Sequence, residues 1–265
     1  MTPASAEIVG WISLGVCLAC SLVIVVDEFV LGHRQQMAIM NVVHPVTALY
    51  LGPVWLWAYF TRGRRSSRKV MAARAGALAR RGADPDRLER EGRSVAPEDM
   101  SAWHVGNAVS HCGAGCALGD IAGEWIVFAF GLAVAGVGTF GPELALDFPI
   151  AWLLGVGFQY FTIVPMRDDV SPARGLLLAM RADTLSIVSS QLGLFGWMAL
   201  SHFVIWQPSL PIDSSAHWWM MQVGMVVGYG TAWPVNLLLV KKGWKEKMDH
   251  RSHLGMLVER AEEAA

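Results

Sequence analysis

The feature of this sequence that most constrains its fold is a series of apolar runs about twenty residues long. Because a helix rises 1.5 Å per residue, a run of about 17 to 25 apolar residues is enough to cross roughly 30 Å of hydrocarbon. Only 16% of the 265 residues are charged, whereas soluble domains carry about a quarter. The sequence therefore predicts an all-α, polytopic membrane protein.

Six runs are expected to form transmembrane helices: 8–31, 40–60, one within 101–141, 148–165, 184–206 and 217–240. The first run has no preceding basic residue and no small-residue cleavage site after it, so it is not a removable signal peptide. The expected organisation is two helices in 1–60, a basic cytoplasmic loop in 61–100, a four-helix membrane domain in 101–240 and a cytoplasmic tail in 241–265.

The basic residues predict the orientation. In the six-span arrangement, 20 of the 21 Lys and Arg residues fall on one side, in the segments 62–99, 166–183 and 241–265, and only Arg34 falls opposite. Cytoplasmic loops are enriched in Lys and Arg. Both termini are therefore expected in the cytoplasm.

The segment 101–141 is too long for one ordinary span, because an unbroken helix of that length would reach about 60 Å. Two full spans would place the Lys-rich tail outside. The segment is therefore expected to form one span with a cytoplasmic extension, the alternative being a re-entrant turn broken near Gly113 and Gly115.

This segment also holds the densest cluster of polar residues. At 100° per residue, two neighbouring stripes of one helix carry imidazoles, thiols and a carboxylate, beside a ladder of glycines that lets another helix approach. Thiolate and imidazole suit a soft or borderline cation, with Glu124 as a group for proton coupling. The alternative is that small residues permit close packing while the polar groups bond between helices. The predicted metal ligands are His104, His111, Cys112, Cys116 and Asp120.

A second pattern of imidazoles and thioethers is expected near the outer face, as a weak uptake site for Cu(I) or Ag(I). The alternative is that the methionines fill gaps in the core. The residues are His33, Met37, Met40 and His44 at the start of the second run, and His217 and Met221 at the start of the sixth.

Two further pairs lie on the first run. Cys17 and Cys20 have the spacing of a redox dithiol, but packing of two buried thiols explains them as well. Asp27 and Glu28 are expected either to pair with Arg34 or to bind cations.

The stretch from Trp103 to Trp125, WHVGNAVSHCGAGCALGDIAGEW, resembles the signature of a bacterial membrane family, domain of unknown function 4396. The resemblance extends from about residue 101 to the sixth run. Relatives are sometimes associated with copper oxidases, so the resemblance implies a bacterial inner-membrane protein and favours copper. It assigns no activity.

These patterns predict a protein that binds and transports copper. No phosphate-binding loop and no nucleic-acid module is present, so ATP hydrolysis by this chain is not expected. Zinc is the alternative metal; a membrane redox protein with haem or reactive thiols, and a non-catalytic subunit of a membrane complex, are the alternative functions. The expected partners are the lipid bilayer, a periplasmic copper protein, another membrane subunit or a second copy of the chain.

Overall fold

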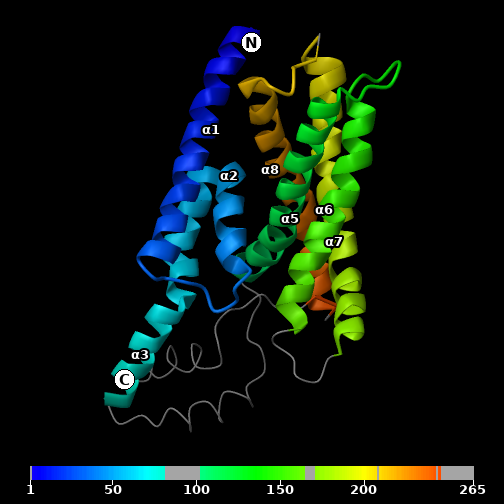
Figure 1. Cartoon of the computed structure of the whole chain (residues 1–265). Helices are drawn as coiled ribbons and strands as arrows, with labels where there is room; N and C mark the ends of the chain where they lie inside the picture. The colour runs from blue at the N-terminus through cyan, green and yellow to red at the C-terminus, as the bar shows by residue number, and fades with distance from the viewer. Residues whose placement is uncertain (1, 81–101, 165–170, 208, 243, 246–265) are drawn as a thin grey trace.

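A computed structural model describes residues 2–80, 102–164, 171–207, 209–242 and 244–245. The described elements are all helical (Figure 1). They are α1 (Pro3–Val25), the π-helix η1 (Val26–Val30), α2 (Met40–Ala58), η2 (Tyr59–Gly63), η3 (Arg64–Ser66), α3 (Arg68–Arg80), α5 (Ala102–Phe130), α6 (Phe140–Ile163), α7 (Pro172–Leu200), η5 (Ser201–Ile205) and α8 (Ser215–Lys241).

Three helices begin at side-chain caps. The hydroxyls of Thr2, Ser171 and Ser214 accept from backbone N–H groups in the first turns of α1, α7 and α8. Such caps satisfy N–H groups that a helix start otherwise leaves without partners. In α1 and α7 a proline follows the cap, where its missing N–H costs nothing.

Five helical segments among the described residues are long and apolar enough to cross a membrane: Pro3–Val30, Val105–Phe130, Phe140–Phe161, Pro172–Ile205 and Ser215–Lys241. The protein is thus a multi-pass membrane protein by length and composition of its helices. The prediction of six spans is not confirmed. The difference lies in the second predicted run, 40–60.

α2 turns back on itself instead of crossing. Gly52 has φ 51° and ψ −127°, a conformation that breaks the helix and that an L side chain rarely adopts. Beyond Gly52 the chain reverses, so the ring of His44 lies 5.8 Å from that of Trp55 and 5.2 Å from that of Tyr59. In a straight helix, residues eleven apart would be separated by about 16 Å. We call residues 40–63 the re-entrant hairpin.

The two ends of the re-entrant hairpin meet on the same side of the molecule. The N–H of Arg68 donates to the carbonyl of Arg34 at 2.9 Å, and Gln35 forms an isolated bridge with Ser67. In Figure 1 both ends lie at the lower end of the bundle, while the N-terminus lies at the upper end. Arg34 therefore lies at the same end as Arg64, Arg68 and Lys69, not opposite them.

The tip of the hairpin is fixed by α8. Pro53 has no N–H, so it cannot bond to the carbonyl of Leu49 one turn earlier. Gln222 of α8 donates to this carbonyl at 2.7 Å and accepts from Ser13 of α1 at 2.7 Å. One amide thus joins α1, the hairpin and α8 within the apolar region.

The remaining four spans form a bundle around α5. α5 runs unbroken from Ala102 to Phe130, which confirms a single helix and excludes a break at Gly113 or Gly115. The expected close contact of the glycine ladder is also present. A Cβ at Gly115, Gly119 or Gly123 would overlap Gly155, Ala151 or Asp147, respectively, on antiparallel α6.

Candidate functional site

A line of buried polar side chains runs through the bundle of α5, α6, α7 and α8. Its upper part, towards the N-terminal end of α1, holds four carboxyl groups that are at most 4% exposed. Asp120 and Glu124 lie one turn apart on α5, and Glu143 and Asp147 one turn apart on α6. Asp147 lies within electrostatic range of the other three. Residues four apart share a helix face, so both pairs point into the same interface.

Two further polar residues surround these carboxyl groups. His217, in the first turn of α8, places Nε2 3.4 Å from Oε2 of Glu124. Gln191 of α7 donates from Nε2 to Oδ1 of Asp120 at 2.9 Å. The carboxyl groups therefore have neighbours from all four helices of the bundle.

The middle of the line consists of small polar groups. Cys116, one turn before Asp120 on α5, interacts with that carboxyl group and with the hydroxyl of Ser190. One turn further down, Sγ of Cys112 lies 2.7 Å from Oγ of Ser186 on α7. Both thiols are free and at most 1% exposed.

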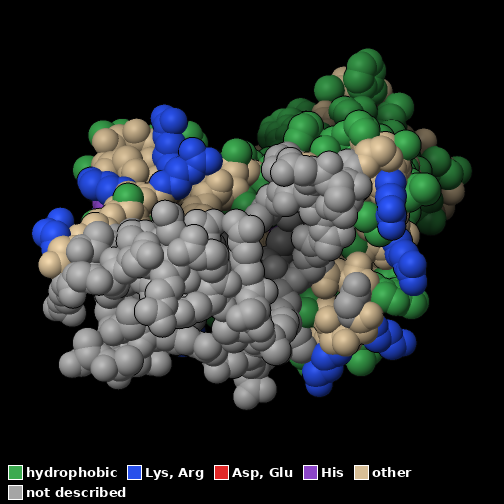
Figure 2. Space-filling model, turned by 90° about the horizontal axis from the view of Figure 1, so that it is seen from below, with side chains coloured by type: hydrophobic (Ala, Val, Ile, Leu, Met, Phe, Trp, Pro, Cys, Tyr) green, Lys and Arg blue, Asp and Glu red, His purple; other side chains and the backbone are tan. Residues whose placement is uncertain are grey.

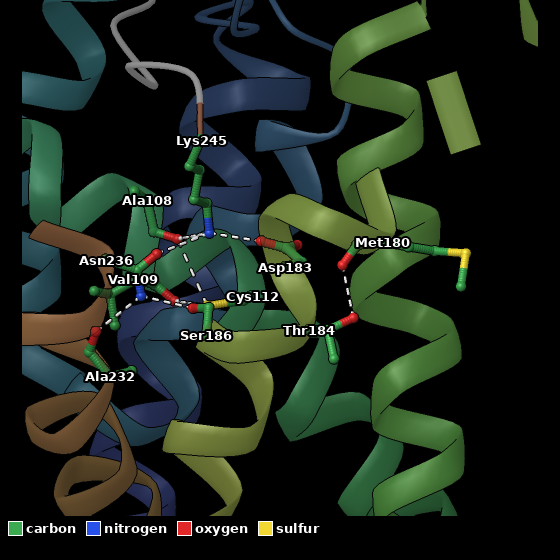
Figure 3. A network of polar contacts seen from close by, with 10 residues as sticks. All are labelled: Ala108, Val109, Cys112, Met180, Asp183, Thr184, Ser186, Ala232, Asn236 and Lys245. Atoms are coloured by element: carbon green, nitrogen blue, oxygen red, sulfur yellow. Dashed lines mark hydrogen bonds and ion pairs between the residues drawn. The ribbon is translucent and has the colours of Figure 1, made fainter. Parts of the chain in front are cut away.

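The lower end contains Lys245, which follows α8 and is drawn at the top of the close-up view (Figure 3). Its ammonium group donates to Oδ1 of Asp183 at 2.6 Å, to Oδ1 of Asn236 at 2.9 Å and to the carbonyl of Ala108 at 3.1 Å. Nδ2 of Asn236 donates to Ser186 at 2.6 Å. Lys245 thus completes what we call the polar column: Glu143, Asp147, Glu124, His217, Asp120, Gln191, Ser190, Cys116, Cys112, Ser186, Asn236, Asp183 and Lys245.

Lys245 is only 2% exposed, although it lies beyond the last span. Burial alone lowers the pKa of a lysine, but the negative charge of Asp183 outweighs this, so the net effect raises the pKa of Lys245. The ammonium group therefore stays charged at neutral pH. Asp183 and Lys245 form a buried ion pair that links α7 to the chain after α8.

A separate polar cluster lies at the lower end of α1. Asp27, in the π-helix η1, accepts from the hydroxyl of Tyr59 at 2.9 Å and contacts Nε of Arg64 at 3.1 Å and Nδ1 of His33 at 3.2 Å. The expected partner Arg34 is replaced by Arg64, because the re-entrant hairpin brings its last turn back to α1. We call these four residues the Asp27 cluster.

The predicted metal ligands contact different neighbouring residues. Cys112 faces Ser186, Cys116 faces Ser190 and Asp120, and the ring of His111 packs at 6.1 Å against Phe158. The side chain of His104 lies outside the described residues. In the described part of the chain, no three His, Cys, Asp or Glu side chains are arranged to hold a metal ion.

The histidines expected in an outer uptake site lie at opposite ends of the bundle. His33 joins the Asp27 cluster at the lower end of α1, and His44 packs against the hairpin aromatics. His217 begins α8 beside Ser215, which bonds to Glu7 at the upper end of α1. Twenty residues of α1 separate these levels, about 30 Å. Met37, Met40 and Met221 contribute to the hydrophobic core.

Eight residues of the polar column were missed from the sequence, and four of them are ionisable: Glu143, Asp147, Asp183 and Lys245. The fourth span was expected to begin at residue 148, whereas α6 begins at Phe140 and includes both acids. The signal was the four-residue spacing of Glu143 and Asp147, which matches Asp120 and Glu124. Lys245 is one of several cations in a basic tail, and no pattern in the neighbouring sequence indicates that its side chain is buried.

The fold and the polar column define an all-helical, multi-pass membrane protein with charged groups buried inside its bundle. Within that class, the chain matches the family model described as Domain of unknown function (DUF4396) over residues 103–245, more than half of its length. The chain belongs to this family. The matched region begins in the first turn of α5, extends through α8 and contains the whole polar column, up to Lys245. No curated protein and no solved structure matches the chain.

Proposed function

We propose that this protein moves cations across a membrane along the polar column, and that protons are the ions carried by its upper part. The observation behind the proposal is the sequence of buried polar groups from Glu143 to Lys245. Ionisable groups inside a membrane are costly, and they usually mark ion pathways or proton relays. Four carboxyl groups and an imidazole in mutual range supply the groups that such a relay needs.

In this mechanism the carboxyl groups exchange protons in steps. A proton taken up at Glu143 passes to Glu124 and His217, and then through Asp147 to Asp120. Carboxyl and imidazole groups both accept and release a proton without moving far, so a relay needs no wide pore. The lower part of the column consists of hydroxyl, thiol and amide groups and ends at the ion pair of Lys245 and Asp183, which acts as a gate that must open before a proton leaves at this end.

We further propose that the lower end of the bundle faces the cytoplasm and that the N-terminus lies outside. With the hairpin re-entrant, Arg34 joins the cations at the lower end, so the positive-inside rule favours five spans more strongly than six. Figure 2 displays Lys and Arg side chains among the described residues of this face. A cysteine introduced at Ala4 should react with an impermeant maleimide from outside, and one at Ser66 should not. The reverse labelling pattern would refute this orientation.

The test of proton movement uses purified protein in liposomes that contain a pH-sensitive dye. A membrane potential, negative inside, should acidify liposomes that contain the parent protein. Asp120→Asn and Glu124→Gln should each lower the initial rate at least tenfold, because an amide cannot carry the proton. Glu7→Gln is the matched control, since Glu7 is a carboxylate outside the column. No acidification by the parent, or equal rates in all variants, would refute the proposal.

The second candidate function is transport of a soft metal, with copper as the favoured metal. Its support is the position of both thiols, since Cys112 and Cys116 line the middle of the column beside Asp120. Thiolate ligands select Cu(I) over hard cations such as Mg²⁺. In this version copper is the cargo and the carboxyl groups couple its movement to protons.

The same liposomes, loaded with a Cu(I)-sensitive dye, test this candidate. Cu(I) uptake should occur with the parent, compete with Ag(I) and be lost in the variant with Cys112→Ser and Cys116→Ser. The matched control changes Cys17 and Cys20 to Ser, because these thiols lie on α1 away from the column. Proton flux without Cu(I) uptake would reject copper and leave the proton proposal standing.

A further inference from the structure

A second site lies on the outer surface of the bundle, away from the polar column. An apolar groove of about 360 Å³ runs between the lower part of α1 with η1 and the last turn of the re-entrant hairpin. This volume falls in the usual range for small-molecule sites, about 300–1,000 Å³. Its lining residues are Leu22, Val23, Val26, Asp27, Leu31, Phe60 and Arg64.

The groove is about as long as one leaflet of the hydrocarbon core is thick. Leu22 and Leu31 are nine residues apart, which corresponds to about 14 Å along the helix and roughly one leaflet of a 30 Å hydrocarbon core. Leu22, Val26 and Leu31 are each about half exposed, so they face the surroundings of the bundle and not its core. The π-helix η1 widens this part of α1 and turns Asp27 inward, into the Asp27 cluster.

Cations lie at the lower end of the groove. Arg64 keeps contact with Asp27 and His33, yet its side chain remains 38% exposed, and its guanidinium has five N–H donors in all. Lys69 donates to the carbonyl of Leu31 at 3.0 Å, which places its ammonium group at the mouth of the groove. Arg68 donates to another carbonyl close by. The single carboxylate in the lining is already engaged by three partners.

We propose that this groove binds one anionic phospholipid of the adjacent leaflet. One acyl chain lies between α1 and the hairpin, and the phosphate is bound by Arg64 and Lys69. Guanidinium and ammonium groups are the standard phosphate partners, and the net positive charge at this end favours an anionic over a zwitterionic headgroup. The binding site is independent of the proposed cation transport, since none of its residues belongs to the polar column.

The test measures lipid retention by native mass spectrometry of the detergent-purified chain. After titration with phosphatidylglycerol or phosphatidylcholine, one phosphatidylglycerol per chain should be retained with at least about fivefold preference. Lys69→Gln should weaken it about fivefold, since one cation near a membrane surface contributes ~1 kcal/mol. Val26→Trp should abolish retention by filling the groove. The chain-free headgroup glycerophosphoglycerol should not compete.

Two control variants separate the site from general surface effects. Ile12→Trp introduces the same indole at an exposed position of α1 outside the groove, and Arg174→Gln removes a cation at the start of α7. Both should retain phosphatidylglycerol like the parent. Equal retention of phosphatidylcholine, or unchanged binding by Val26→Trp, would overturn the proposal. Neither Lys69→Gln nor Val26→Trp removes a partner from the ion pair of Asp27 and Arg64. Thermal unfolding of each variant, beside Ile12→Trp, separates loss of lipid binding from loss of the fold.

Discussion

Replacement of Lys245 by Met tests whether the ion pair at the lower end holds the bundle together. Met keeps an unbranched side chain only one atom shorter than that of Lys, but it removes three hydrogen bonds, to Asp183, Asn236 and Ala108. The carboxylate of Asp183, which has no measurable exposure, is then left without its cation. Removing one partner of a buried pair costs about 3–5 kcal/mol. We expect a loss of this size in the free energy of unfolding.

The assay is unfolding in detergent followed by intrinsic tryptophan fluorescence, for which the chain has 12 Trp residues. Lys242→Met is the matched control, because Lys242 is exposed and lies 5.5 Å above the ring of Trp244. An exposed cation–π contact contributes about 0.5–1 kcal/mol. The double variant with Lys245→Met and Asp183→Leu should recover much of the loss, because an apolar pair can replace a buried ion pair.

The same pair predicts a pH dependence with a definite sign. The pKa of Lys245 is higher in the folded state than in the unfolded state, so its contribution is complete below the unfolded pKa. It is lost as the pH rises through the folded pKa, in the alkaline range. The reasoning fails if Lys245→Met destabilises no more than Lys242→Met, or if parent and Lys245→Met lose stability equally on alkaline titration.

The remaining predictions concern two glycines. Gly119→Leu would overlap Ala151 on α6 and should cost at least about 1–3 kcal/mol. Gly157→Leu is its control, because a Cβ there meets nothing within 4 Å; equal thermal stability of the two variants would refute the contact. Gly52→Ala combines a positive φ with a clash at 2.9 Å from Cys17, and should cost about 1–3 kcal/mol. Gly15→Ala, at an open helical position, should be neutral or stabilising in the same thermal assay.

The sequence by itself was sufficient to predict the class of fold and the helix contact at the centre of the bundle. Apolar runs about twenty residues long predict helices because the bilayer leaves no partner for an exposed backbone N–H or C=O. The glycines at four-residue spacing, 115, 119 and 123, predict a close helix contact on one face, and α6 packs there. Both properties depend on spacing along one helix, which the sequence contains directly.

Only the tertiary structure decided that the second run turns back. Pro45 and Pro53 indicate a bend in that run, but a bend is compatible with a full span. The reversal requires Gly52 at a positive φ, a side chain on α8 that donates to the carbonyl of Leu49, and the ion pair of Arg64 with Asp27. Each partner is distant in sequence. In the proposed five-span arrangement the N-terminus therefore lies on the other side of the membrane from the end of α8.

The polar column also depends on contacts between distant segments. Asp120 and Glu124 are visible as candidates within one helix, but Glu143 and Asp147 join them only because α6 packs antiparallel on α5. Lys245 looks like one cation in a basic tail, and its burial follows from the carboxylate of Asp183, 62 residues earlier in the chain. A sequence records which groups can carry charge, whereas the packing of helices decides which charges are removed from water and must therefore be paired.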